Sequence, residues 1–173
     1  MSGGLDPGFG EAPNWLVFYV NTRHEKAVAR QLADRGLEHY LPLYDSTRRW
    51  KDRKVVVSLP MFDGYVFARC SGADRYRVLG IHAVVRCLSA QGAPLVIPDD
   101  EFTRMRTLLE TRSATPYSYL EAGRRVRLCG GALDGFEGRY IRQKGRHRAI
   151  VQLDRIMRAV LVDVDAADLK VVH

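Results

Sequence analysis

The last third of the chain alternates short β-branched segments with glycine-containing turns, and this pattern constrains the fold more than any other feature. β-branched residues favour strands, and glycine disfavours the interior of a helix. Closing such strands on themselves removes their exposed edges, so a small barrel is the economical arrangement. We therefore predict an all-β module built from five strands: Arg125–Cys129, Gly138–Arg142, Ala149–Leu153, Ala159–Val162 and Asp168–Val172.

The preceding part of the chain mixes predicted strands with predicted helices. Trp15–Val20 and Tyr65–Arg69 are aromatic and β-branched runs that predict strands. Thr22–Glu25 matches a capping box, which predicts a helix ending at Gly36. Asp74–Leu79 can form a short second helix before Gly80. A third helix is predicted after Asp99–Asp100, because apolar residues follow at helical spacing; we interpret this carboxylate pair as helix capping.

Two domains follow from this contrast, and the fold class is α+β. Residues 1–13 are rich in glycine and proline and predict a mobile tail. Residues 14–112 form the mixed domain. The hydrophobic period is lost over residues 113–121, which predicts a linker, and residues 122–173 form the all-β domain.

Basic residues outnumber acidic ones, 27 to 20, giving a formal net charge of +7. The densest basic run surrounds Trp50, lies between two extended segments and predicts a basic hairpin arm: Arg48, Arg49, Lys51, Arg53 and Lys54. A second run covers Arg139–Arg148. Such clusters suit phosphate backbones. A solvated loop that keeps the protein soluble fits either run equally well.

The sequence argues against an enzyme, a cofactor site and a metal site. The five histidines stand far apart, and the motifs of serine hydrolases, phosphate loops and zinc proteases are absent. Three widely spaced cysteines indicate reduced core residues rather than disulfides or zinc ligands: Cys70, Cys87 and Cys129. There is neither an apolar run near the ~20 residues of a membrane helix nor a signal-peptide pattern, so we expect a cytoplasmic protein.

The segment from Gly123 to Gly138 resembles the KOW motif, in which a strand, a glycine-rich turn and a second strand follow one another. Its turn carries Gly131, Gly135 and Gly138, which allow positive φ and close backbone approach. Leu133 and Phe136 can plug the barrel end. Ribosomal proteins and several translation and transcription factors carry this motif.

The front half resembles the N-terminal (NGN) domain of NusG-type transcription elongation factors. The similarity rests on five segments in the family's order and spacing: Trp15–Tyr19, the helix start at Glu25–Lys26, Tyr40–Tyr44, Trp50–Lys54 and Pro60–Phe67. It implies an antiparallel sheet flanked by helices, followed by a small SH3-like β-barrel, the KOW domain. It also implies that the first domain binds the clamp helices of RNA polymerase and suppresses pausing or termination.

Four aromatic residues match the polymerase-binding patch of the family: Tyr19, Phe62, Tyr65 and Phe67. Tyr19 and Phe67 fit the core as well as an interface, whereas Phe62 and Tyr65 flank the turn at Gly64 and are expected to be exposed. The predicted contacts to non-template or upstream DNA come from Arg23, His24 and the basic residues of the predicted arm.

The Leu41–Leu43 and Arg48–Lys54 segments resemble the specialised, RfaH-like antiterminators more than the housekeeping factors. Ser71–Arg77 is shorter than the stretch with which those proteins contact the polymerase gate loop. In the family, the KOW domain recruits Rho or a ribosomal protein, and the sequence selects neither. The alternative is a KOW-type RNA- or ribosome-binding protein, indicated by the arginines of the last domain.

Overall fold

The computed structural model describes residues 12–51, 53–111, 114–117, 124–143 and 146–172. These residues form two compact units. One runs up to Leu41 and resumes over Asp63–Phe102, and the other combines Pro42–Phe62 with the chain from Thr103 onward. Most of the predicted tail, and residues 113 and 118–121 of the predicted linker, lie outside the described residues. The predicted domain boundaries stay predictions.

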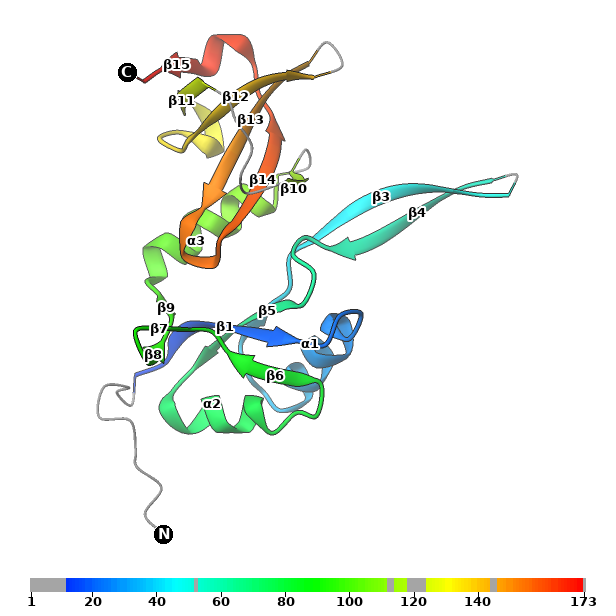
Figure 1. Ribbon diagram of the computed structural model, residues 1–173, viewed down its shortest axis with the longest axis vertical. Helices are drawn as coiled ribbons and strands as arrows, with labels where there is room; N and C mark the ends of the chain where they lie inside the picture. Colours follow the sequence, from blue (N-terminus) through cyan, green and yellow to red (C-terminus); the bar gives the residue numbers. More distant parts are fainter. Residues whose placement is uncertain (1–11, 52, 112–113, 118–123, 144–145, 173) are drawn as a thin grey trace. The chain divides into compact units, whose positions relative to one another are not determined.

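The first unit is built on an antiparallel sheet with β1 (Asn14–Val20) at its centre (Figure 1). β1 pairs with β5 (Tyr65–Cys70) on one side and β6 (Val84–Cys87) on the other. β2 (His39–Tyr40) pairs with β5, and β9 (Val96–Ile97) pairs with the start of β1. The predicted strands and the antiparallel arrangement are confirmed.

One face of this sheet is covered by α1 (Glu25–Asp34) and α2 (Gly72–Leu79). Side chains alternate between the two faces of a strand, so every second residue of β1 and β5 points toward these helices. Val28, Leu32 and Val78 of the helices join one buried cluster with the strand residues Leu16, Phe18, Val20, Val66, Ala68 and Cys70. This cluster is the hydrophobic core between the sheet and the two helices.

The predicted capping box at Thr22–Glu25 is wrong. α1 begins at Glu25 with His24 as its N-cap, and no side chain caps it. Glu25 is 2% exposed, and its carboxylate accepts a hydrogen bond from the backbone N–H of Gly64, 39 positions along the chain. A local pattern was therefore overridden by a contact that only the folded chain makes. The predicted end of the helix at Gly36 is confirmed, with φ of +68° at that glycine.

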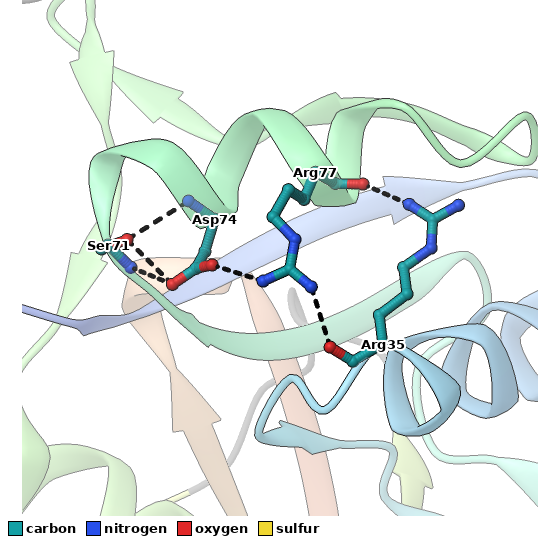
Figure 2. Close-up of polar contacts among 4 residues, drawn as sticks. All are labelled: Arg35, Ser71, Asp74 and Arg77. Carbon is teal, nitrogen blue, oxygen red and sulfur yellow. Dashed lines mark hydrogen bonds and ion pairs between the residues drawn. The ribbon is translucent and has the colours of Figure 1, made fainter.

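Figure 2 shows how α2 is capped and tied to the end of α1. The Ser71 hydroxyl accepts from the Asp74 N–H, and the Asp74 carboxylate accepts from the Ser71 hydroxyl at 2.8 Å and from Arg77 at 2.9 Å. Arg77 also donates to the carbonyl of Arg35, whose own guanidinium donates to the carbonyl of Arg77. Each arginine thus donates to a backbone carbonyl at the C-terminal end of the other helix, where carbonyls lack intrahelical partners.

The third predicted helix is confirmed as α3 (Asp99–Leu109). Its residue Phe102 covers part of the opposite face of the sheet. The Phe102 ring stacks on Trp15 at 3.6 Å with an interplanar angle of 7°, and it meets Tyr40 and Phe67 edge-on. β7 (Ser89–Ala90) and β8 (Ala93–Pro94) precede this helix as a separate two-stranded sheet.

The predicted basic hairpin arm is confirmed, with β3 (Leu43–Trp50) paired to β4 (Arg53–Pro60) along its whole length (Figure 1). At its base, the N–H of Met61 donates to the carbonyl of Pro42 at 2.8 Å. Lys51, in the turn, has φ of +50°. A continuous ladder therefore fixes which arm side chains share a face.

The rest of the second unit is a six-stranded antiparallel sheet in the order β10-β14-β13-β12-β11-β15. All five predicted strands are confirmed, with short 3₁₀ turns between them: β11 (Arg124–Leu128), η1 (Gly131–Leu133), β12 (Glu137–Gln143), β13 (Arg146–Leu153), η2 (Asp154–Ile156), β14 (Arg158–Asp163), η3 (Ala166–Asp168) and β15 (Leu169–Val171). Ile150, Ala159 and Leu161 form a buried cluster between neighbouring strands.

The predicted closed barrel is not found. Within the described residues no ladder joins the two outer strands, β10 and β15, so the pairing order stays open. The outer edge of β14 is occupied instead by an unpredicted strand, β10 (Thr115–Tyr117), which comes from the predicted linker. Pro116 argues against a strand interior but is tolerated at an edge, where no donor is needed.

Candidate interaction surfaces

Tyr65, Tyr19 and Arg86 stand side by side on three neighbouring strands, and we call them the tyrosine row. The register pairs Tyr19 with Tyr65 on β5 and with Arg86 on β6. The two rings meet edge-on at 5.8 Å, and the guanidinium of Arg86 lies 5.9 Å from the centre of the Tyr19 ring. Both tyrosines are half-buried and Arg86 is exposed. The row lies on the face opposite α1 and α2, so it combines accessible aromatic surface with a positive charge.

The four aromatic residues predicted to bind polymerase do not share one surface. Phe67 is fully buried against Tyr40 and Phe102, because it points to the part of the sheet that Phe102 covers. Phe62 is 3% exposed, so the exposure expected beside the Gly64 turn is wrong for this residue. Tyr19 and Tyr65 remain as the accessible members of the predicted patch.

Glu25 and Gly64 support the tyrosine row from within. Gly64 has φ of +77°, and a Cβ at this position would lie 2.8 Å from Cε2 of Tyr19. The Glu25 carboxylate accepts from the Gly64 N–H at 2.7 Å, and the Gly64 carbonyl accepts from the Val20 N–H at 2.8 Å. A larger residue at Gly64 would push the Tyr19 ring aside. The buried carboxylate therefore fixes the turn at which the Tyr19 ring approaches the backbone closely.

Sequence reasoning missed Arg86 and the supporting function of Glu25. Arg86 lies on β6, and its neighbour in space depends on the register between β1 and β6, which shifts between Tyr19 and Val20. Such an irregularity leaves no trace in the hydrophobic pattern. Glu25 fits a local capping pattern so well that its distant partner could not be foreseen.

Arg23 and His24, predicted to bind nucleic acid, are exposed residues in the turn before α1. Arg23 has φ of +71°, and Nδ1 of His24 lies 3.3 Å from the carbonyl oxygen of Thr22. They belong to the first unit, whereas the arm belongs to the second. Their assignment to DNA therefore stays a prediction of its own, separate from that of the arm.

The arm presents its cations on two faces. Cross-strand partners of an antiparallel pair point to the same side, and neighbours along a strand point to opposite sides. Trp50 pairs with Arg53 and shares its face with Arg48. Arg49 pairs with Lys54 on the other face, so two like charges stand directly opposite each other. Like charges in this position destabilise a hairpin, so the pair has no folding benefit.

The charge of the arm is not neutralised within the described part of the protein. All five predicted cations are exposed, and no ion pair there involves any of them: Arg48, Arg49, Lys51, Arg53 and Lys54. Trp50 is 66% exposed between them. An uncompensated cluster of this kind attracts polyanions and loses that attraction as salt rises.

The glycine-rich turn of the second unit fits its predicted conformation. Gly135 has φ of +78°, and a Cβ on Gly138 would lie 2.5 Å from the carbonyl oxygen of Ile150. Gly131 opens η1, which ends at Leu133. The Phe136 ring is buried, with the guanidinium of Arg104 at 5.0 Å from its centre. Gly138 thus permits the close approach of β12 to β13.

Many arginines of the second unit are paired with carboxylates. Arg125 and Arg127 both bond Glu137, and the hydrogen bond and charge of Arg127 lower the pKa of that carboxyl. Arg146 and Arg148 lie 3.2 and 2.8 Å from the carboxylate oxygens of Asp163. The free cationic surface is therefore smaller than the sequence alone indicates.

Two further absences hold for the described residues alone. No group of three or more His, Cys, Asp or Glu side chains there could hold a metal ion. The longest helix in these segments is α3, with 11 residues, and none is long and apolar enough to cross a membrane.

Comparison with known proteins gives one family and a related fold. The family model described as transcription termination factor NusG matches residues 13–106, more than half of the chain. A comparison with curated proteins finds no match. The chain is similar to a solved structure described as "Domain interaction in Thermotoga maritima NusG", with 16% identity and a TM-score of 0.62, covering 93% of this chain and 98% of that one. A chain of the MjSpt4:Spt5 complex in conformation A has 17% identity and a TM-score of 0.29, covering 91% and 97%.

Proposed function

Because this chain belongs to the family of the transcription termination factor NusG, we propose that it is a transcription elongation and antitermination factor acting on RNA polymerase. Its N-terminal domain, predicted over residues 14–112, binds the clamp helices of the polymerase, and the factor suppresses pausing or termination. The observation that carries this proposal is the tyrosine row, an accessible aromatic pair on a sheet face within the residues that match the family. Exposed aromatic residues beside an arginine are typical of protein interfaces.

The arm is the proposed DNA-binding element, contacting the non-template strand or upstream DNA. Its support is the charge on Arg48, Arg49, Lys51, Arg53 and Lys54, which forms no ion pair within the described residues and suits a phosphate backbone. Arg23 and His24 extend this proposal to the first unit. A factor of this kind works in the cytoplasm.

The RfaH-like specialisation also belongs to the proposal. It rests on the resemblance of the Leu41–Leu43 and Arg48–Lys54 segments. We propose no gate-loop contact through Ser71–Arg77, because Ser71 and Asp74 are engaged in capping α2 and Arg77 in bonding Arg35 (Figure 2). Residues 122–173 are the proposed KOW domain, recruiting Rho or a ribosomal protein.

Capture of core RNA polymerase by the immobilised full chain tests the polymerase proposal. Truncating a central interface residue often costs on the order of 2 kcal/mol or more. The double variant Tyr19→Ala/Tyr65→Ala should therefore bind polymerase at least about thirtyfold more weakly. Tyr76→Ala is the matched control, because Tyr76 is a 53% exposed tyrosine on α2, a helix that covers the other face of the sheet. Circular dichroism must show that each variant is folded.

Salt dependence separates this proposal from RNA or ribosome binding. A primary RNA binder loses affinity steeply as salt rises, because counterions are released from the phosphates. Polymerase capture through the tyrosine row should depend less on salt. If the double variant is folded and still captures polymerase with wild-type affinity, the clamp assignment is wrong. The alternative, a KOW-type RNA- or ribosome-binding protein, then becomes the leading hypothesis.

A further inference from the structure

Trp50 is a large apolar side chain that the fold of the arm does not use. It is 66% exposed at the end of β3, and no ring or cation–π contact within the described residues involves it. The other tryptophan, Trp15, is 5% exposed and stacked on Phe102. An indole left in water near the tip of a hairpin therefore needs an explanation outside the arm.

Two guanidinium groups accompany the indole on its face of the arm. Arg53 is its cross-strand partner, and Arg48 lies two residues before it on the same strand. Cross-strand Cβ atoms are roughly 5 Å apart. Residues two apart on one strand share a face at roughly 7 Å, so both cations reach groups bound next to the ring. The Trp50 face thus combines a flat aromatic surface with charges suited to phosphates on either side.

We infer that the Trp50 face binds single-stranded DNA by stacking an unpaired base on the indole, with Arg48 and Arg53 contacting the adjacent phosphates. Base stacking on an aromatic side chain within a basic groove is the general mode of single-strand binding, and it tolerates any sequence. In duplex DNA the faces of the bases are covered by their neighbours, so the indole has no partner there. The inference rests on the proposed function for the source of the strand, the DNA opened by polymerase.

The opposite face of the arm provides the contrast. Arg49 and Lys54 provide two positive charges and no aromatic ring. This face can therefore contact the phosphates of single-stranded and of duplex DNA alike. A protein partner is disfavoured at the Trp50 face, because the neighbouring cations would have to be desolvated and none has a carboxylate partner in the described part of the arm. Unpaired DNA supplies both the ring and the charge.

The test measures binding of the full chain to labelled oligonucleotides of about 12 nucleotides at low salt, with no polymerase present. Three DNA ligands are compared: oligothymidine, an abasic strand with the same phosphates, and a duplex. Trp50→Ala should weaken binding to oligothymidine roughly five- to hundredfold and leave the abasic strand unaffected. Trp50→Phe should lose less, because a ring remains.

Two control variants isolate the indole. Val56→Ala removes an apolar side chain that is 63% exposed on the same arm but on the other face, and it should change nothing. Arg49→Ala/Lys54→Ala should weaken binding to oligothymidine and to the abasic strand by the same factor, weaken duplex binding as well, and reduce the dependence on salt. Oligothymidine should also quench the tryptophan fluorescence of the wild type, since Trp15 is buried, and Trp50→Phe should remove most of that quenching.

Several results would overturn the inference. One is equal wild-type affinity for the thymidine and abasic strands, and another is unchanged oligothymidine binding by a folded Trp50→Ala variant. A preference above about tenfold for oligouridine RNA would reject the assignment to DNA. Loss of DNA-free polymerase capture in Trp50→Ala, with oligothymidine binding intact, would assign the indole to a protein interface. Because the oligonucleotide assay contains no polymerase, its failure leaves the clamp proposal standing, and failure of polymerase capture leaves a DNA-binding arm measurable.

Discussion

Replacing Glu25 by alanine should loosen the Gly64 turn and disturb the tyrosine row without touching either tyrosine. The Glu25 side chain is 2% exposed, and its carboxylate accepts from the Gly64 N–H at 2.7 Å. The alanine variant leaves that buried N–H without its acceptor. The carbonyl of Gly64, in the same turn, accepts a hydrogen bond from the N–H of Val20, which directly follows Tyr19. The defect should therefore spread to the strand that carries the row.

The expected cost follows from the charge on the acceptor. A hydrogen bond to an ionised group contributes about 1.5–3 kcal/mol, and an orphaned buried donor costs about 1–3 kcal/mol. These describe one interaction from two sides, so Glu25→Ala should lower the free energy of unfolding by about 2–3 kcal/mol. Glu25→Gln keeps an acceptor oxygen and loses only the charge, so about 1 kcal/mol is expected.

Amide hydrogen exchange at Gly64 measures this effect locally. A loss of 2–3 kcal/mol should accelerate exchange by roughly 30- to 100-fold in Glu25→Ala, and polymerase capture should weaken in parallel. Glu38→Ala is the matched control, because Glu38 is an exposed glutamate whose contact with Arg69 spans 3.6 Å. Wild-type exchange at Gly64 in Glu25→Ala would refute the reasoning. So would equal losses in the alanine and glutamine variants, because the acceptor would then not matter.

Three other positions give separate predictions. Alkylation of the folded protein at mild pH should modify the half-buried Cys129 first, since burial raises the pKa of Cys70 to about 12 and excludes reagent; mass spectrometry of the labelled peptides checks this order. Gly138→Ala should unfold the second unit at lower urea, because the added Cβ would meet a β13 carbonyl oxygen at 2.5 Å; equal stability would show that β12 can shift. The hydrogen bond from Ser71, together with Arg77, lowers the pKa of Asp74 below its ordinary value of 3.8. The capping of α2 by the Asp74 carboxylate should therefore be present above pH 3.8 and be lost as the pH falls through the lower folded-state pKa. Asp74→Asn should flatten this acid dependence, measured by amide hydrogen exchange in α2.

Elements with a local residue pattern can be predicted from the sequence. Pairings between segments that are far apart in the chain cannot. β1 and α3 follow from their own residues, a dense aromatic run in one and helical spacing in the other. The arm follows from two extended segments separated by a turn. The pairing of β10 with β14 joins Thr115–Tyr117 to a strand more than 40 positions later, and no hydrophobic period marks so short an edge strand.

The site shows the same division. Tyr19 and Tyr65 can be selected from the sequence as aromatic strand residues. Their exposure depends on how much of the sheet face Phe102 covers. Phe67 lies two residues beyond Tyr65 on the same strand face, yet it is fully buried. Side-chain alternation assigns a residue to a face and cannot say which part of that face another element covers.

Chemistry distinguishes the covered part of this face from the uncovered part. Phe67 and Phe102 meet where the rings are buried, and neither carries a polar group that would need a partner. Tyr19 and Tyr65 lie on the part of the face that Phe102 leaves uncovered. The hydroxyl of a tyrosine can be hydrated while its apolar ring contacts a partner. In the free protein the tyrosine hydroxyls are hydrated, and in a complex the burial of the tyrosine rings contributes to the binding free energy. Exchanging the types should therefore separate the two properties: Tyr19→Phe and Tyr65→Phe keep the ring for binding while making the free protein less soluble.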